Sequence, residues 1–384
     1  MPTPTPLCLL SALLAATTVA TDPPAHDRQQ LFVGGTEGYH SYRIPALVTS
    51  TRGTLLAFCE GRKNSPADYG DIDLVLKRSE DHGATWSPLA IVCGEGGHTW
   101  GNPTPVTDRE TGRIWLFFNW NAEDHNQFGD HGYEKISAWG DRRLFVTFSD
   151  DDGVTWAPRQ EMTESLTPKH HVWDAVGPGN GIQTVAGPKP GRLIIPAIGR
   201  NLFSDDHGAS WQVHEIGGKT SEATIVELSD GRLLRNDRSN KTVWSEHKRR
   251  LVSVGQIGER WGDWHPDAAL PTPRCQASSI RYAHDGTECL LFLNPATTTR
   301  RRHMRVRVST DDGATWERGR FLPGPGAPDE PSPTERQGGY SGLTQTAEGG
   351  IAALVEWNAD VGDRGSHKSI ALHRFTLDWI ADPK

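Results

Sequence analysis

The sequence is poor in cysteine, in clustered histidines, in net basic charge and in long apolar segments, which are the features of metal sites, redox centres, nucleic-acid-binding surfaces and membrane spans. It holds 5 cysteines in 384 residues, and its 16 histidines are scattered without the spacing of a ligand set, so we expect no obligatory metal and no cofactor. Acidic residues outnumber basic ones, 48 to 40, which argues against the basic surface that nucleic-acid binding needs. The one long apolar stretch is too short to span a bilayer, so no membrane span is expected.

Helical patterns are also missing. No stretch combines a sustained helical period with capping residues at its ends. The chain instead contains 41 glycines, 26 prolines and 14 tryptophans, and short apolar runs alternate with turn residues about every ten positions. This pattern predicts an all-β protein. The expected strands include Ile44–Val48, Leu55–Cys59, Asp73–Arg78, Ile114–Phe118, Leu144–Phe148, Leu193–Ala197 (part of the longer strand-like run Leu193–Phe203), Thr224–Leu228, Ser279–Tyr282, Leu290–Leu293, Met304–Val308 and Ile351–Glu356.

An eight-residue motif, Ser-x-Asp-x-Gly-x-Ser/Thr-Trp, recurs along the chain, and each copy follows an expected strand. The four copies are Ser79–Trp86, Ser149–Trp156, Ser204–Trp211 and Ser309–Trp316. Asp and Ser side chains accept hydrogen bonds from nearby backbone N–H groups, and glycine adopts positive φ without steric cost. The spacing does not supply the ligands of a calcium loop. Each copy is therefore predicted to be a structural hairpin turn within one sheet, anchored by its tryptophan.

Repeats of this kind predict an array of similar units. The last interval between copies is about twice the others, and Ser253–Trp261 lies inside it as an eroded, longer copy. Units of this length with about four strands each are typical of propeller blades. We therefore expect a six-bladed β-propeller in which one blade is completed by both ends of the chain. No linker or change in composition marks a second domain, so residues 21–384 are expected to form this propeller.

The N-terminal residues have the pattern of a targeting segment. Leu7–Ala20 is apolar and ends in small residues, so residues 1–20, with Cys8, are expected to be a signal peptide and the protein to be secreted and extracellular. The remaining cysteines allow either two disulfides or buried free thiols. They are Cys59, Cys93, Cys275 and Cys289. Asn240-Lys-Thr242 is a glycosylation sequon, relevant if the host glycosylates secreted proteins.

Several charged or hydroxyl side chains next to expected strand ends are not explained by the turns. Arg43, within Ser41-Tyr-Arg43-Ile-Pro45, stands where a strand would prefer Val or Ile. Tyr340 is flanked by small residues in Gly338-Gly-Tyr340-Ser-Gly342, which leave it accessible. The other candidates are Arg62 and Asp68 before the first repeat, Glu222 and Arg238 around a strand–turn–strand unit, and the run Arg300–Arg302. Charged residues at strand ends are usually solvated, so each alone is weak evidence of a site.

Together these motifs resemble the exo-sialidase (neuraminidase) family of six-bladed propellers, most closely its secreted microbial, including fungal, members. The resemblance spans Leu31 to Trp379 and rests on Tyr-Arg-Ile-Pro, the repeats, the Glu222–Arg238 stretch and the Gly-Tyr-Ser run. It implies roles by position: Arg43, Arg238 and Arg301 as three arginines that bind the substrate carboxylate, Arg62 as an arginine lining the sugar site, Asp68 as general acid/base, Tyr340 as nucleophile and Glu222 as its partner carboxylate. Where the family often has Asn two residues after the third arginine, this chain has His303.

The physical chemistry agrees with this allocation. Guanidinium groups give charge-assisted, partly bidentate hydrogen bonds to a carboxylate, which lysine supplies less well. The carboxylate of a sialoside would repel an Asp or Glu nucleophile, whereas a neutral tyrosine avoids that repulsion. Tyrosine is a poor nucleophile unless a base takes its proton, which is the role that Glu222 would have. The resemblance thus implies retaining hydrolysis of terminal sialic acid from sialylated glycans through a covalent tyrosyl intermediate.

Two alternatives stay open. A non-catalytic glycan-binding propeller would lack Asp68 or Tyr340, and both are present. A trans-sialidase would need an aromatic surface for its acceptor. Aromatic loop residues available for this surface are Trp120, Tyr133, Trp173, Trp261 and Trp264. The long polar loop Asn119–Glu134 is expected to shape the pocket for the C5 substituent and glycerol tail of the sugar, but the sequence does not distinguish N-acetyl, N-glycolyl and deaminated (KDN) forms.

Overall fold

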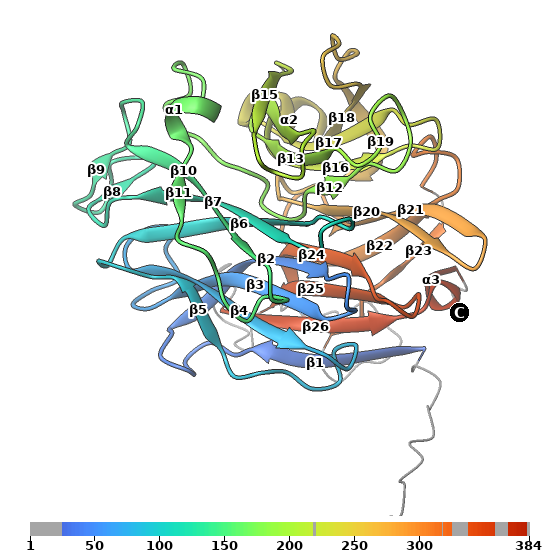
Figure 1. Ribbon diagram of the computed structural model, residues 1–384, viewed down its shortest axis with the longest axis horizontal. Coiled ribbons are helices and arrows are strands. Elements are labelled where there is room, and N and C mark those ends of the chain that lie inside the picture. Colours follow the sequence, from blue (N-terminus) through green and yellow to red (C-terminus); the bar gives the residue numbers. More distant parts are fainter. Residues whose placement is uncertain (1–24, 218–219, 317, 325–336, 358–367, 382–384) are drawn as a thin grey trace, which may run out of the picture.

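The computed structural model describes residues 25–217, 220–316, 318–324, 337–357 and 368–381 (Figure 1). These residues form antiparallel four-stranded blades around a centre, and the expected all-β, six-bladed β-propeller is confirmed. The expected signal peptide, residues 1–20, and Cys8 lie outside the described residues.

Each blade runs from an inner strand through two middle strands to an outer strand. Blades 1 and 2 contain β2 (Ser41–Thr49), β3 (Leu55–Arg62), β4 (Ile72–Ser79) and β5 (Ala90–Cys93), then β6 (Thr99–Thr107), β7 (Ile114–Asn121), β10 (Arg142–Ser149) and β11 (Gln160–Glu161). Blades 3 and 4 contain β12 (Ile182–Gln183), β13 (Leu193–Ala197), β14 (Arg200–Ser204) and β15 (Gln212–Glu215), then β16 (Thr220–Glu227), β17 (Leu233–Ser239), β18 (Arg249–Gly255) and β19 (His265–Pro271). Blades 5 and 6 contain β20 (Ser278–His284), β21 (Thr287–Pro295), β22 (Met304–Ser309) and β23 (Arg318–Phe321), then β24 (Gln337–Gln345), β25 (Ile351–Trp357), β26 (Ser369–Phe375) and β1 (His26–Phe32).

Few other elements are present in the described ranges. The short helices are α1 (Thr163–Leu166), α2 (Lys241–His247) and α3 (Leu377–Ala381). The loop between β7 and β10 carries a small parallel sheet of β8 (His125–Asn126) and β9 (Glu134–Lys135). A parallel bridge between Ile72 and Thr99 joins blades 1 and 2.

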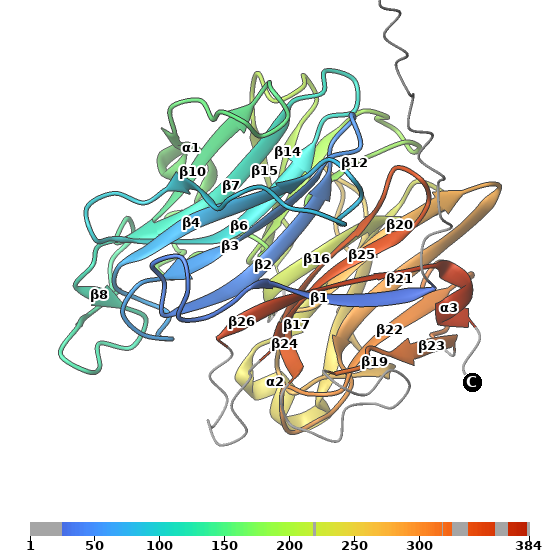
Figure 2. The same ribbon diagram turned by 90° about the horizontal axis from the view of Figure 1, so that it is seen from below.

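Both ends of the described chain complete the last blade, as expected. Strand β1 pairs antiparallel with β26, with His26 opposite Phe375 and Phe32 opposite Ile370. Figures 1 and 2 show the dark blue β1 directly beside the red β26. The inner strands of successive blades contact each other, as β2 does with β6 and β24, so these strands line the centre of the propeller.

All four repeats are hairpin turns between the third and fourth strands of a blade, which confirms their structural role. In the first copy Gly83 N donates to Ser79 Oγ at 2.7 Å and Thr85 N donates to Asp81 Oδ1 at 2.8 Å. The eroded copy also joins third and fourth strands, β18 and β19. It has no aspartate at the key position, yet its tryptophan, Trp261, is only 5% exposed.

The predicted strand Leu193–Ala197 is confirmed as β13. The longer strand-like run Leu193–Phe203 is not one strand but two, β13 and β14, joined by a tight hairpin in which Ala197 lies opposite Arg200. Gly199 permits this turn because it adopts a φ of 64°. The sequence did not predict this turn, because the residues on both sides of it are apolar like those of a continuous strand.

The core lies between the blades, because side chains alternate between the two faces of each strand. On β3, Leu55, Ala57 and Cys59 pack toward blade 6, while Leu56 and Phe58 pack toward blade 2. The cysteines occupy such buried positions, and all four in the described ranges are free thiols. The thiol interpretation is therefore confirmed and the disulfide alternative is wrong.

Candidate active site

Three of the candidate residues, Arg43, Glu222 and Tyr340, lie where inner strands β2, β16 and β24 begin. At each place the pairing register of the strand shifts within a few residues of the candidate side chain. Such bulges bend a strand and redirect its side chains. They bring the three residues together on one face of the propeller, opposite the face that carries the repeats.

The Tyr340 hydroxyl is bonded to both a carboxylate and a guanidinium. It donates a short hydrogen bond to Glu222 Oε1, and Arg238 Nη1 donates to its oxygen at 2.9 Å. Arg238 also forms an ion pair with Glu222. Tyr340 is only 6% exposed, so the expectation that its small neighbours leave it accessible was wrong. Burial together with the negative charge of Glu222 raises its pKa well above the ordinary value. The hydroxyl is thus neutral, and its proton points at a base.

Arg43 is oriented by Glu356, a residue that the sequence alone did not single out. Arg43 Nε donates to Glu356 Oε1 at 3.0 Å, and Nη2 donates to Oε2 at 3.3 Å. The same buried carboxylate accepts from the backbone N–H groups of Ile44 at 3.0 Å and Tyr340 at 2.9 Å. Glu356 therefore fixes two bulges as well as a guanidinium. Its only signal in the sequence was a glutamate at the end of an apolar strand, Ile351–Glu356.

Asp68 lies in the loop between β3 and β4 and forms ion pairs with two arginines. Its Oδ1 lies 2.7 Å from Arg62 Nη1 and 3.1 Å from Arg43 Nη1. The side chain is 73% exposed, so solvent screens these pairs. Desolvation by the surrounding loop favours the neutral acid, but the charges of Arg62 and Arg43 outweigh it and hold the pKa of Asp68 well below its usual range. In this arrangement Asp68 is an anion.

Arg62 is itself held by a buried carboxylate. Its Nε and Nη2 donate to Glu60 Oε2 at 3.1 and 2.6 Å. Glu60 and Arg62 point to the same side of β3 because side chains alternate along a strand. The backbone N–H of Asn102 donates to Glu60 Oε1 at 3.0 Å. The Glu60-Gly-Arg62 sequence is thus a preformed ion pair, of which only the arginine was predicted to have a role.

Arg301 is the member of its arginine run that faces Tyr340. Its guanidinium lies 5.2 Å from the centre of the Tyr340 ring, and that of Arg43 lies 5.4 Å from the same centre. Unlike Arg43 and Arg238, Arg301 forms no ion pair within the described part of the chain. His303 packs near the ring of Phe321, with 6.2 Å between ring centres. All seven predicted residues therefore meet on one face.

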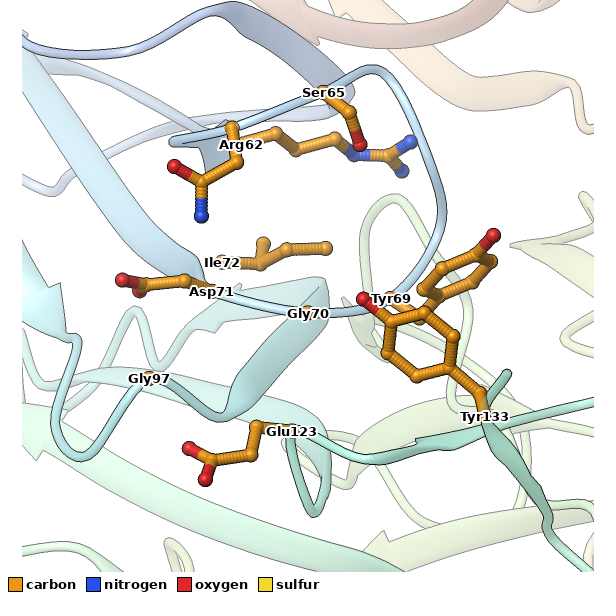
Figure 3. Close-up of a pocket in the computed structure, with 10 residues that line it drawn as sticks. Arg62, Ser65, Tyr69, Gly70, Asp71, Ile72, Gly97, Glu123 and Tyr133 are labelled. Atoms are coloured by element: carbon orange, nitrogen blue, oxygen red, sulfur yellow. The ribbon is translucent and has the colours of Figure 1, made fainter. Parts of the chain in front are cut away.

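A pocket of about 340 Å³ adjoins this cluster and shares Arg62 with it (Figure 3). Figure 3 shows Tyr69 and Tyr133 on one side, with ring centres 4.4 Å apart, and Asp71 and Glu123 across from them. Glu123 and Tyr133 belong to the Asn119–Glu134 loop. This loop therefore contributes to a polar pocket beside the loop that carries Asp68.

The five aromatic residues predicted to lie at the edge of the site are found in different parts of the propeller. Trp261 and Trp264 lie in the turn between β18 and β19, on the face with the repeats, so their proposed place at the rim was wrong. Trp173 lies under the guanidinium of Arg142 at 4.4 Å, and Trp120 lies under that of Arg143 at 4.8 Å. Tyr133 lines the pocket of Figure 3.

Over the ranges that the structure describes, no group of three or more His, Cys, Asp or Glu side chains is placed to hold a metal ion. Nor is any helix in those ranges long and apolar enough to cross a membrane.

Fold and site together define a class of protein, a propeller glycosidase with arginines that suit an anionic sugar. The BNR repeat-like domain matches residues 53–352. An exo-alpha-sialidase of Aspergillus fumigatus is 42% identical over 89% of this chain and 86% of its own length, and one of Arthroderma benhamiae is 42% identical over 89% and 85%. The solved structure of the Hadza microbial sialidase Hz136 is 27% identical, with a TM-score of 0.77 over 92% of this chain and 69% of that one. The chain belongs to the exo-alpha-sialidase family of glycoside hydrolases.

Proposed function

We propose that the protein releases terminal sialic acid from sialylated glycans by retaining hydrolysis through a covalent bond to Tyr340. The observation that carries this proposal is the Tyr340 hydroxyl donating to Glu222 within a cluster of arginines. A tyrosine activated by a neighbouring base is the nucleophile suited to a substrate that itself carries a carboxylate at the reacting carbon.

Binding of the substrate carboxylate falls to Arg43, Arg238 and Arg301, which surround the Tyr340 ring. Carboxylates orient two of them, Arg43 through Glu356 and Arg238 through Glu222. The third, Arg301, forms no ion pair with a described residue, and its guanidinium lies 5.2 Å from the centre of the Tyr340 ring. Because guanidiniums bind carboxylates with planar, bidentate geometry, this set would hold the anomeric carbon over the Tyr340 oxygen. Arg62 would line the sugar next to them.

The reaction then takes two steps. In the first, Glu222 accepts the Tyr340 proton while the tyrosyl oxygen forms a bond to the anomeric carbon, and Asp68 gives a proton to the departing glycosidic oxygen. In the second, Asp68 takes a proton from water, the water oxygen attacks the anomeric carbon, and the bond to Tyr340 breaks with return of the proton from Glu222. Two inversions leave the configuration of the sugar unchanged.

The preference among forms of sialic acid would depend on the pocket of Figure 3 and on the Asn119–Glu134 loop that contributes to it. We propose that the Asn119–Glu134 loop, through Glu123 and Tyr133, contacts the C5 substituent or the glycerol tail. Both groups are polar and uncharged, which suits hydroxyl and carboxylate side chains. N-acetyl, N-glycolyl and deaminated (KDN) sugars are therefore the three substrates to compare.

The test is release of a fluorescent aglycone from α-sialosides that differ only at C5, followed by NMR of the first anomer formed. Activity on at least one sugar with initial release of the α-anomer is expected; activity on none would refute the proposal. Tyr340→Phe keeps the ring but removes the nucleophile, so near-normal turnover by this variant would overturn the tyrosyl intermediate.

Transfer to a sugar acceptor is the second candidate, because the Tyr69 and Tyr133 rings offer an aromatic surface next to the Asp68 loop. With a sialoside and excess lactose, hydrolysis predicts free sialic acid as the main product. Sialyllactose as the main product would favour transfer instead. A protein that binds sialosides without any turnover would be the glycan-binding propeller.

We further propose that the protein is secreted after removal of residues 1–20. Its support is the apolar stretch Leu7–Ala20 with small residues at its end. N-terminal sequencing of the protein recovered outside the producing cells would find Thr21 first. Retention of the protein in the cells with Met1 intact would contradict the proposal.

A further inference from the structure

A fourth arginine, Arg274, lies beside the site and has no part in the reaction proposed above. It belongs to the connection from β19 to β20, which reaches the face where the inner strands begin. Its charge interacts with those of Arg238, Glu222 and Arg301 and with Tyr340. Arg274 is therefore a neighbour of the groups that would hold and attack the sugar.

The backbone of Arg274 is in an unfavourable conformation. Its φ is 58°, in the left-handed region that glycine adopts readily and that side chains with a Cβ disfavour. Residues other than glycine persist in this region when the surrounding structure holds them there, and they cluster at functional sites. A glycine here would relieve the strain, so the arginine is not explained by the fold.

The guanidinium of Arg274 also lacks an anionic partner among the described residues. It is half-buried, its Nε is buried without a hydrogen-bond partner, and it forms no ion pair with any residue that the structure describes. Burial and the positive charge of Arg238 lower its pKa. By contrast, Arg43, Arg62 and Arg238 are each bonded to a glutamate.

These observations favour a ligand anion at Arg274, because no described residue supplies one. One carboxylate offers about four acceptor positions, and Arg43, Arg238 and Arg301 already supply more donors than it accepts. The first carboxylate of the substrate therefore leaves Arg274 unsatisfied. A second anion next to Arg274 would neutralise a guanidinium that is partly desolvated and close to other positive charges.

We propose that Arg274 binds a second anionic group, a carboxylate or a sulfate, on the glycan to which the cleaved sialic acid is attached. The preferred substrates would then be sialic acid linked to another sialic acid, or sialic acid on a sulfated sugar. This inference rests on the proposed function, since it concerns the leaving part of the same substrate.

The experiment compares kcat/KM for three substrates that share the terminal sugar: a disialoside, a sialoside of neutral lactose and the same sialoside with a sulfated sugar. Arg274→Gly removes the charge and relieves the backbone strain, Arg274→Gln removes the charge at similar size, and Arg274→Lys keeps the charge. In the wild type, kcat/KM for an anionic substrate should exceed that for the neutral one. In the Gly and Gln variants this ratio should fall about tenfold, the effect of one charge-assisted hydrogen bond, and Lys should retain part of it.

The comparison distinguishes a bound carboxylate from a bound sulfate, and a failure of this inference from a failure of the proposed function. A fall of the ratio for the disialoside identifies a carboxylate as the group bound, and a fall for the sulfated substrate identifies a sulfate. Rising salt should lower the wild-type ratio but not that of Arg274→Gln. Equal losses on all three substrates, or an unchanged ratio, would overturn the inference while leaving the proposed function intact. Failure of the wild type on every sialoside would instead refute the proposed function and the inference with it.

Discussion

The charge state of Asp68 leads to the sharpest prediction, because the arginines around it oppose its proposed role. A general acid must carry a proton, yet Arg62 and Arg43 hold the pKa of Asp68 below its usual range. A bound sialoside places its own carboxylate against Arg43 and thereby adds a negative charge near Asp68. We expect the pKa of Asp68 to be higher in the substrate complex than in the free protein.

The size of the difference follows from Coulomb's law. Two unit charges roughly 5 Å apart interact by about 1 kcal/mol in water and by about 3 kcal/mol at an effective dielectric constant near 20. Since the Asp68 side chain is 73% exposed, the lower half of this range applies. The expected difference is about 1.4 kcal/mol, which corresponds to about one pKa unit.

The assay is the pH dependence of kcat and of kcat/KM on one fluorogenic sialoside. The profile of kcat reports the complex and that of kcat/KM reports the free protein. Because the protonated acid is lost as pH rises, kcat/KM should begin to fall at lower pH than kcat, by about one unit. Coincident profiles, or the opposite order, would refute the reasoning.

Two variants test which cation holds the pKa of Asp68 down. Arg62→Gln removes the nearer cation, so the pKa of Asp68 should rise in the free protein and in the complex alike, and both profiles should shift to higher pH with their separation kept. Lys63→Gln is the matched control, because Lys63 is the next residue but binds Asp71 at 2.9 Å and Asp73 at 3.1 Å instead of Asp68. It should leave both profiles at their wild-type positions. An equal shift of both profiles in Lys63→Gln would point to loop distortion instead.

Three further predictions concern single contacts. Glu356→Gln keeps the shape of the side chain but removes the buried counter-charge of Arg43 and leaves it only the exposed Asp68; kcat/KM should fall about tenfold or more and the free energy of unfolding by about 3 kcal/mol, and normal kinetics would exclude the orienting role of Glu356. Asp151→Ala removes three hydrogen bonds from one repeat turn, so urea unfolding should show a loss of about 1–2 kcal/mol with kcat/KM unchanged. Asp174→Asn leaves the fully buried Arg200, now 2.6 Å from Asp174, without a counter-charge; a loss of about 3–5 kcal/mol is expected, and a loss below 1 kcal/mol would show that the pair is not needed.

The repeats made the fold predictable because their hydrogen bonds are local. Ser79, Asp81, Gly83 and Thr85 bond within a span of a few residues, so the order of side chains along the chain is enough to specify the turn. Four such turns and the eroded copy at Ser253 mark five blades, and the ends of the chain supply the sixth. The hairpin at Gly199 was missed because nothing in the apolar run around it differs from a continuous strand.

The candidate residues of the site were predictable from their motifs, but their partners were not. Glu356 contacts Arg43 across most of the chain, and no local pattern connects them. Arg274 was missed for the same reason, since its strained φ and its nearness to Arg238 exist only in the folded protein. Trp261 shows the opposite error: a loop position suggested the rim of the site, whereas the turn containing it lies on the other face.

Neighbours along the chain set the strand pattern, the turns, the number of blades and the residue types of the site, so all of these were predictable before the fold was known. The folded arrangement was needed to see that the four described cysteines are free thiols. It was also needed to see that Glu222 and Glu356 orient Tyr340 and Arg43, and that Arg274 forms no ion pair with a described residue. Charge and burial act through space, so the environment of each group depends on residues brought together from different blades.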